Sequence, residues 1–270
     1  MIRFPNCKIN LGLNILERLP DGYHGIATLF YPIGLSDILE INASSGKETR
    51  LTVSGIALPG DPKDNLCFRA WNILHEECGI PAVEMHLHKL IPAGAGLGGG
   101  SSDAAQTLMI LNELFLLGLG HEKLALRATQ LGMDCTFFLL NKPAIGEGRG
   151  EILNPFAKVL TGKFIVLVKP EVHVSTAEAY AGVVPFKSHI HIGDVLNTPI
   201  EAWKDQLEND FEKSVFQKFP DIGRIKEELY SNGAVYASMS GSGSAVYGIF
   251  NEKVNLSSLF NGCFVWQDFV

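Results

Sequence analysis

A regular alternation of apolar and polar residues stands near the start of the chain. From Cys7 to Ile15 every second residue is apolar, and the positions between hold polar residues or glycine, among them Lys8 and Asn10. Successive side chains of a strand point to opposite faces, so residues two apart share a face. The pattern therefore predicts a strand that carries Lys8 and Asn10 side by side.

The pattern that follows predicts further strands and then helices. Residues 83–87 alternate between apolar and polar, which is typical of a half-exposed antiparallel strand. Gly79 and Pro81 are helix stop signals, and they follow an amphipathic segment that ends at residue 78. The elements predicted in this part are strands 27–32, 37–41 and 83–87, and helices 65–78, from the glycine-rich segment to about 116, and 121–131.

A second part is predicted to begin near Thr161. Its first strand, residues 164–168, is continuously apolar, and Ser175 with Glu178 forms a capping box for a short helix. Helices are expected over 210–219 and 222–230, and strands over 234–239 and 245–250 with the loop 240–244 between them. This order favours an α+β fold over a doubly wound parallel sheet, with domains at residues 1–160 and 161–270.

Composition narrows the function classes. The 270 residues are 46% hydrophobic and carry a net charge of -7, which argues against a nucleic-acid or anionic-membrane partner. The five cysteines are scattered and form no CxxC pair, so neither a disulfide framework nor a zinc site is indicated. With no signal-peptide or membrane-spanning pattern, we expect a cytoplasmic protein. Composition leaves open whether the protein is a monomer or a homodimer.

The segment PAGAGLGGGSSDA, residues 92–104, holds five glycines and then turns helical near Ser101 or Ser102. Glycine lets backbone N–H groups surround an anion, and a helix N-terminus attracts the same charge, so the segment predicts a phosphate-binding loop. Walker A chemistry is excluded because Gly100 is followed directly by Ser101. A ligand-free glycine-rich turn is the alternative, and Asp103 is expected to cap the helix.

The GxGxxG match within this segment, at Gly94, Gly96 and Gly99, is weak evidence for a dinucleotide site. A Rossmann fold needs a buried parallel strand before the first glycine and an acidic residue at the end of a second strand. Here the preceding strand is half exposed, and the nearest acid, Glu122, lies in a helical stretch. A nicotinamide-dependent oxidoreductase is therefore only an alternative.

Three separated segments, KINLGLNI with PDGYH, PAGAGLGGGSSDAA, and SGSGSAVYGIF, make the chain resemble the GHMP small-molecule kinases. The resemblance implies a two-domain fold with a nucleotide-binding N-terminal half and a smaller C-terminal α+β half. PDGYH, GMDCTFF and ENDFE are most similar to members that use ATP, as its Mg²⁺ complex, to phosphorylate the 2-hydroxyl of 4-diphosphocytidyl-2-C-methyl-D-erythritol in non-mevalonate isoprenoid synthesis. Another GHMP kinase, for homoserine, mevalonate or a sugar, and a non-catalytic GHMP-like sensor are the alternatives.

The resemblance also implies site residues. Asp134 would be the catalytic base and Lys8 its cationic partner, as phosphoryl transfer requires. From the residues alone, Lys8 could be a solvated strand residue and Asp134 the cap of a helix beginning near Cys135. Thr136 stands where the family usually has proline, which leaves the backbone around Asp134 less certain.

Binding residues follow from the same resemblance, with no protein ligands assigned to the magnesium ion and no separate metal site. The alternative for Asn65 is a helix N-cap, and the alternative for Lys89 is a solvated strand end. Each aromatic substrate residue could instead be a buried or rim side chain. The loop 241–244 could buttress the active site or be an ordinary hairpin loop. The resemblance implies ATP contacts from Asn65, Lys89, Pro92, Gly94, Gly96, Leu97, Gly98, Gly99, Gly100, Ser101 and Ser102, and substrate contacts from Asn10, Tyr23, His24 and Tyr180.

Overall fold

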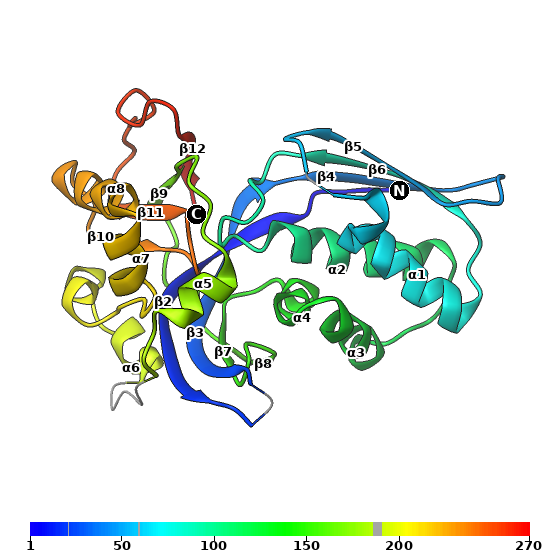
Figure 1. Ribbon diagram of the computed structural model, residues 1–270, viewed down its shortest axis with the longest axis horizontal. Helices are drawn as coiled ribbons and strands as arrows, with labels where there is room; N and C mark the ends of the chain where they lie inside the picture. The colour runs from blue at the N-terminus through cyan, green and yellow to red at the C-terminus, as the bar shows by residue number, and fades with distance from the viewer. Residues whose placement is uncertain (21, 59, 186–190) are drawn as a thin grey trace. The chain divides into compact units, whose positions relative to one another are not determined.

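The computed structural model describes residues 1–20, 22–58, 60–185 and 191–270. The chain divides into two compact units, each assembled from several stretches of sequence (Figure 1). Unit 1 comprises Met1–Cys7, Leu35–Ala93 and Gly98–Lys142, and unit 2 comprises Lys8–Gly34, Gly94–Leu97 and Pro143–Val270. The glycine-rich segment thus contributes to both units, while the sequence division at residue 160 stays a prediction.

Unit 1 is a four-stranded sheet covered by helices. Its strands follow the order β1-β4-β6-β5, with β6 antiparallel to β4 and parallel to β5. Burial alternates along β6, as predicted, because Val83, Met85 and Leu87 face the core shared with the helices. The bounds are β1 (Ile2–Arg3), β4 (Ile38–Ala43), β5 (Arg50–Gly55), η1 (Pro62–Asp64), α1 (Leu66–Cys78), β6 (Val83–Lys89), α2 (Gly99–Leu114), α3 (His121–Leu131) and α4 (Met133–Leu140).

Unit 2 contains two four-stranded sheets, of order β2-β3-β7-β8 and β10-β11-β9-β12. Strands β2 and β3 also extend by a few residues into the segments assigned to unit 1. The bounds are β2 (Asn6–Arg18), β3 (His24–Ser36), β7 (Ala144–Glu147), β8 (Ile152–Pro155), β9 (Phe164–Lys169), α5 (Thr176–Ala181), α6 (Ile192–Leu196), η2 (Ile200–Asp205), α7 (Glu212–Lys218), α8 (Pro220–Ser231), β10 (Tyr236–Met239), β11 (Val246–Phe250) and β12 (Phe264–Phe269).

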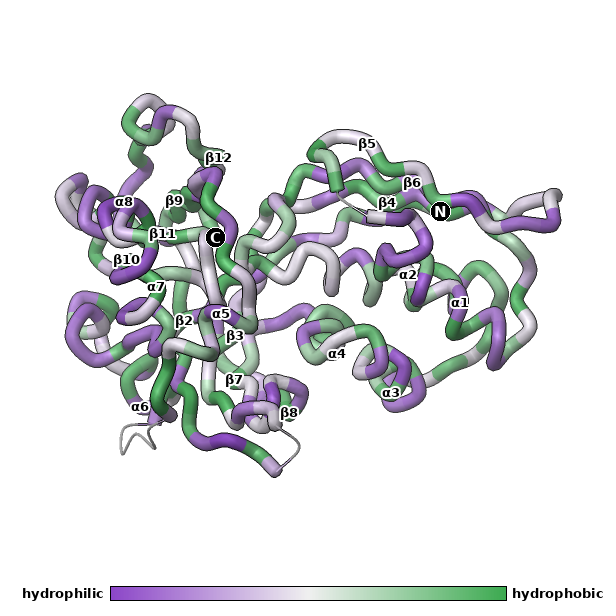
Figure 2. Tube along the Cα trace, viewed as in Figure 1, coloured by the Kyte–Doolittle hydropathy of each residue, from purple (hydrophilic) through white to green (hydrophobic). Residues whose placement is uncertain are grey.

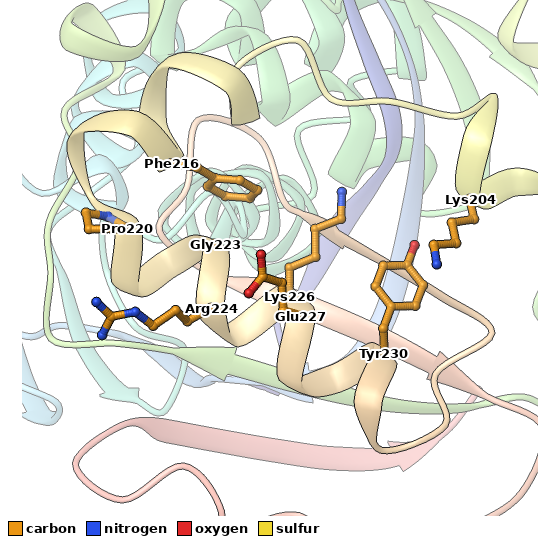
Figure 3. Close-up of a pocket in the computed structure, with 8 residues that line it drawn as sticks. All are labelled: Lys204, Phe216, Pro220, Gly223, Arg224, Lys226, Glu227 and Tyr230. Atoms are coloured by element: carbon orange, nitrogen blue, oxygen red, sulfur yellow. The ribbon is translucent and has the colours of Figure 1, made fainter.

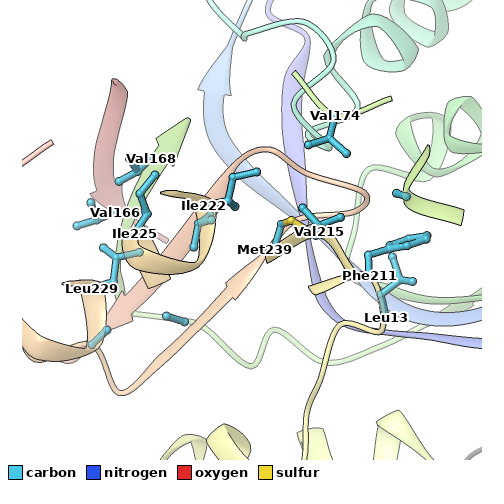
Figure 4. Close-up of a cluster of buried hydrophobic side chains, with 14 of the residues drawn as sticks. Leu13, Val166, Val168, Val174, Phe211, Val215, Ile222, Ile225, Leu229 and Met239 are labelled. Carbon is cyan, nitrogen blue, oxygen red and sulfur yellow. The ribbon is translucent and has the colours of Figure 1, made fainter. Parts of the chain in front are cut away.

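The core of unit 2 forms where helix α8 packs on the second sheet. Ile222, Ile225 and Leu229 share one face of α8, and they lie against the β9 residues Val166 and Val168 in Figure 4. Figure 2 shows the same division along α8, which changes between hydrophilic and hydrophobic positions. The helical period of three to four residues places these side chains on one stripe, so the amphipathic sequence alone selects the buried face.

Most predicted elements are confirmed, and the α+β fold is confirmed with them. Helix α3 has the predicted bounds, and Ser175 caps α5 by accepting from the backbone N–H of Glu178. Helix α2 begins at Gly99, two residues before the predicted start. Strands β1, β5, β7, β8 and β12 were not predicted. Among the described residues, no helix combines the length and the hydropathy needed to cross a membrane.

Candidate active site

The glycine loop needs its glycines for two separate reasons. Gly94, Gly96 and Gly98 have φ of 60°, 76° and 69°, a left-handed conformation that side chains with a Cβ rarely adopt. In addition, a Cβ at Gly96 would lie 1.9 Å from the carbonyl oxygen of Ser240, and one at Gly94 would lie 2.7 Å from the His173 ring. The loop backbone is therefore packed directly against other segments of unit 2.

Helix α2 leaves its N-terminal amides available. Its N-cap, Gly98, provides no side-chain hydrogen bond, and the first intrahelical bond runs from the Ser102 N–H to the Gly98 carbonyl. The preceding N–H groups have no partner within the helix, which is the geometry that binds phosphate at helix N-termini. Within the described structure, the buried Ser102 hydroxyl also has no hydrogen-bond partner. The start of α2 thus has the donors that a phosphate-binding loop requires.

Lys89 is buried, with 2% of its side chain exposed, so the alternative of a solvated strand end is wrong. Its ammonium donates to Asp37 and, at 2.8 Å, to Asp103. Burial alone would lower the pKa of Lys89, but the Asp103 and Asp37 carboxylates outweigh it and raise the pKa. The predicted nucleotide contact of Lys89 stays a prediction.

Asp103 does not cap helix α2, because it lies in the helix interior and the cap is Gly98. Its side chain points to Lys89 in the unit 1 core, where burial raises the pKa of the carboxyl to about 7 although Lys89 opposes this. The second Asp37 oxygen accepts from the backbone N–H groups of Leu90 and Ile91. The cluster therefore fixes the strand end that leads into the glycine loop.

Asn65 is the N-cap of α1 and accepts from the Cys67 N–H at 2.9 Å, which confirms the helix-cap alternative. Capping uses the side-chain oxygen and leaves the amide nitrogen as a donor. The predicted contact of Asn65 with ATP is not tested by this geometry.

Lys8 and Asn10 lie side by side on β2, as the alternation predicted, but both are buried rather than solvated. The Lys8 ammonium donates to Asn10 Oδ1 at 2.6 Å and to the Gly96 carbonyl at 2.8 Å. Asn10 in turn donates to Thr28 Oγ1 at 3.0 Å. Unit 2 therefore fixes the cation next to the part of the glycine loop that it contains.

Asp134 lies in the first turn of α4, whose N-cap is Gly132, so the alternative of an Asp134 helix cap is wrong. The Thr136 hydroxyl donates to the Met133 carbonyl at 2.9 Å, and α4 runs on from Met133 to Leu140. The departure from proline therefore leaves a regular helical backbone around the carboxylate.

The aromatic residues predicted to bind substrate gather in unit 2. The rings of His24 and Tyr180 are stacked, with centroids 4.8 Å apart, and Phe211 meets Tyr180 edge-on. Tyr23 is half exposed, with the Arg149 guanidinium 4.7 Å from its ring centroid. Of the PDGYH segment, only Asp21 lies outside the described residues. Flat, partly exposed rings of this kind can stack a nucleobase.

Comparison with known proteins decides the family. The models for the GHMP kinases N terminal domain and the GHMP kinases C terminal match residues 65–142 and 194–261. A 4-diphosphocytidyl-2-C-methyl-D-erythritol kinase of Bacteroides fragilis is 47% identical, covering 99% of this chain and 98% of the relative. The same kinase of Cytophaga hutchinsonii is 50% identical, covering 94% and 93%. The chain belongs to the 4-diphosphocytidyl-2-C-methyl-D-erythritol kinases, a family of GHMP kinases.

Solved structures agree with this family. A crystal structure of 4-(cytidine 5'-diphospho)-2C-methyl-D-erythritol kinase matches with a TM-score of 0.79 and 34% identity, covering 92% of this chain and 90% of that one. The mevalonate kinase of Methanococcus jannaschii matches with a TM-score of 0.71 but 16% identity, covering 99% and 97%, and shares the fold alone. The predicted kinase class, the GHMP fold and the use of ATP are confirmed, and the dinucleotide-binding alternative is excluded.

The sequence reasoning missed residues that contact the predicted site residues. Asp37 and His173 belong to segments without a motif, yet one pairs with Lys89 and the other packs on Gly94. Asn209 and Glu212 lie in the ENDFE segment, which served only to mark the resemblance. Polar side chains at the start of the helix predicted over 210–219 could have drawn attention to Asn209 and Glu212. Their hydrogen-bond partner Met239 is remote in sequence, so the contacts themselves could not be predicted.

Proposed function

We propose that the protein transfers the γ-phosphoryl group of ATP to the 2-hydroxyl of 4-diphosphocytidyl-2-C-methyl-D-erythritol, in the non-mevalonate synthesis of isoprenoid precursors. The observation that carries the proposal is full-length identity of 47% to 50% with kinases of that name, together with the glycine loop and its helix N-terminus. Homoserine, mevalonate and sugar kinases are less favoured, because the solved mevalonate and homoserine kinases are 16% to 18% identical to the chain.

The chemistry is assigned to the residues that the family resemblance implies. Asp134 takes the proton of the acceptor hydroxyl as it attacks the phosphorus, and the Lys8 ammonium offsets the charge that develops on the transferred group. The amides from Gly94 to Ser102 hold the nucleotide phosphates, with Asn65, Lys89, Pro92 and Leu97 completing the nucleotide site.

Recognition of the acceptor is assigned to unit 2. Tyr23, His24 and Tyr180 are proposed to bind the cytidine, by stacking on the base and by hydrogen bonding to its edge, and Asn10 to bind the sugar alcohol. The stacked pair His24 and Tyr180 supports this assignment, since it presents aromatic faces in one place. A cytidine-dependent acceptor preference is the expected consequence.

Magnesium is proposed to arrive with the nucleotide, where its positive charge would lower the negative charge that the attacking hydroxyl meets. The chain fits this role because the buried Ser102 hydroxyl, without a partner in the described structure, stands in the first turn of α2. The protein is further proposed to be cytoplasmic, a monomer or homodimer without a nucleic-acid or membrane partner, and divided functionally at residue 160.

An acceptor comparison tests the function. ATP consumption is measured with the cytidylylated sugar alcohol and with the same alcohol phosphate lacking its nucleotide, and Asp134→Asn serves as the chemically disabled control. We expect turnover with the first acceptor only, and a loss of about 10²- to 10⁴-fold in the variant with unchanged affinity for a non-hydrolysable ATP analogue. Equal use of both acceptors would favour another small-molecule kinase, and normal turnover by the folded variant would remove Asp134 from its role.

A further inference from the structure

The ENDFE segment, residues 208–212, joins two structural elements of unit 2 that carry the site. Its Asp210 carboxylate accepts from the Ile15 N–H at 2.7 Å, and backbone bonds link Leu13 to Glu208 and Asp210 at 2.8 and 2.9 Å. These contacts attach the segment to β2, the strand that bears Lys8. Its other contacts go to the end of β10.

Met239, the last residue of β10, is held on both sides of its backbone. Glu212 Oε1 accepts from the Met239 N–H at 2.8 Å and from Ser238 Oγ at 3.0 Å. Asn209 donates to the Met239 carbonyl at 2.8 Å and to the Gly241 carbonyl at 2.9 Å. Because Asn209 is buried and the Glu212 side chain is only 12% exposed, both sets of bonds lie in a low-dielectric interior, where loss of an acceptor is costly.

The residue after Met239 contacts the glycine loop. Ser240 Oγ donates to the Gly96 carbonyl at 2.9 Å, and the Lys8 ammonium donates to the same oxygen at 2.8 Å. The Ser240 carbonyl lies so close that Gly96 has no room for a Cβ, and the Ala245 N–H donates to the Ala95 carbonyl at 3.2 Å. A shift of the Met239–Ser240 backbone would therefore move the acceptor that Lys8 uses.

We propose that Glu212 is a positioning residue for phosphoryl transfer, which fixes Met239 and Ser240 so that the Gly96 carbonyl and the Lys8 ammonium keep their places. The inference rests on the proposed function for the role of Lys8. Glu212 is not among the residues predicted to contact ATP or the acceptor. It would act through its bonds to the end of β10, and small displacements of a catalytic group can cost about 10²-fold in rate.

The surroundings of the second carboxylate oxygen of Glu212 offer residues for control variants. It accepts from the Lys226 ammonium at 2.5 Å, and Lys226 lines a pocket of about 610 Å³ in which Figure 3 shows it between Phe216 and Tyr230. Arg224 lines the same pocket, but its ion pair is with Asp221, one helical turn away. Variants at Lys226 and Arg224 therefore change the pocket while the Glu212 bonds to Met239 and Ser238 stay possible.

The test is a kinetic double-mutant cycle in the full chain. Glu212→Ala is expected to lower kcat about 10- to 100-fold, with little change in acceptor KM, while Glu212→Gln, which keeps an oxygen for the Met239 N–H, restores most of the turnover. Ser240→Ala should reduce kcat as well, and the double variant should be no slower than the slower single one, because both changes act through the same backbone. Arg224→Gln and Lys226→Met should stay close to wild type.

Several results would overturn the inference. One is a folded Glu212→Ala variant with the kcat of the wild type. Another is a Glu212→Ala/Ser240→Ala double variant in which the two losses of kcat, expressed as free energies, add. If Glu212→Ala does not fold, Glu212→Asp, which is shorter by one methylene, must still lower kcat, and wild-type kcat there would equally refute it. If the wild type turns over a different alcohol only, the proposed acceptor is wrong, and the same variants are then compared on that alcohol.

Discussion

Two buried lysines, one in each unit, are stabilised in different ways. Lys89 in unit 1 donates to the carboxylates of Asp37 and Asp103, whereas the bonds of Lys8 within unit 2 go to an amide oxygen and a backbone carbonyl. Their exposed fractions are nearly equal, at 2% and 3%. Burial therefore does not distinguish the two cations, but the acceptors within their own units do: carboxylates for Lys89 and neutral oxygens for Lys8.

The difference bears on the catalytic role proposed for Lys8 and on how far the Lys89 cluster stabilises unit 1. Carboxylates neutralise a buried ammonium, so the cluster around Lys89 balances most of its own charge inside unit 1. Neutral oxygens orient an ammonium without bringing opposite charge of their own, so the bonds of Lys8 to Asn10 and Gly96 fix the direction of the cation. Such orientation suits the electrostatic role toward transferred phosphate that we propose for Lys8.

The largest expected effect is on stability, in Lys89→Met. Removing the cation leaves two buried carboxylates together, and we expect a loss of about 3 to 5 kcal/mol in the free energy of unfolding, measured by urea denaturation at pH 7. The exposed Lys123→Met is the matched control and should change little. A stable Lys89→Met would show that the two carboxylates do not depend on their cation.

Lys8→Met should give the opposite result. We expect kcat to fall about 10²- to 10³-fold, the scale of a lost transition-state donor, with a smaller loss of stability than in Lys89→Met. Steady-state kinetics and urea denaturation of the same preparations show whether each lysine variant loses mainly activity or mainly stability. Similar profiles for the two variants would end the distinction between a structural and a catalytic lysine.

Asn10→Asp makes the surroundings of Lys8 more like those of Lys89. The new carboxylate would neutralise part of the ammonium charge, so we expect kcat to fall about tenfold, the equivalent of about 1.4 kcal/mol. Asn10→Ala, which removes the acceptor without adding charge, is the comparison variant. If Asn10→Ala is as slow as Asn10→Asp, loss of a contact and not neutralisation explains the effect.

The smallest effect concerns pH. Burial raises the pKa of Asp103 to about 7 in the folded chain, against about 4 when unfolded, so the folded state binds the extra proton between these values. The free energy of unfolding should therefore decrease as pH rises from 5 to 8, and Asp103→Asn should reduce that slope. Urea denaturation across this range measures it, with the exposed Glu122→Gln as control. An unchanged slope would assign the pH dependence to other groups.

The elements that periodicity predicted correctly are those whose burial is decided locally. The alternation from Cys7 to Ile15, the amphipathic stripe of α8 and the capping box at Ser175 all appear in the structure, since each depends on residues a few positions apart. The unpredicted strand β12 pairs along its whole length with β9, about a hundred residues earlier. Its identity as a strand depends on that partner.

Local rules misplaced Asp103 and Lys89 for the same reason. An aspartate near a helix start is typically a cap, which was the expectation for Asp103, and a lysine at a strand end is typically solvated, which was the alternative for Lys89. Asp37, more than fifty residues before Lys89, changes the outcome. With two carboxylates available, burying the three side chains together becomes possible, and no pattern within a short window contains that information.

The sequence by itself determined the α+β class, most helices and strands, and the glycine loop with its helix, because these follow from side-chain periodicity and from the conformations that only glycine adopts readily. Its motifs were also enough to indicate the kinase family. Only the tertiary structure decided which charges are neutralised and which residues hold the loop. Those outcomes depend on pairs such as Lys89 with Asp37 and Glu212 with Met239, whose energies arise when folding removes water from groups distant in sequence.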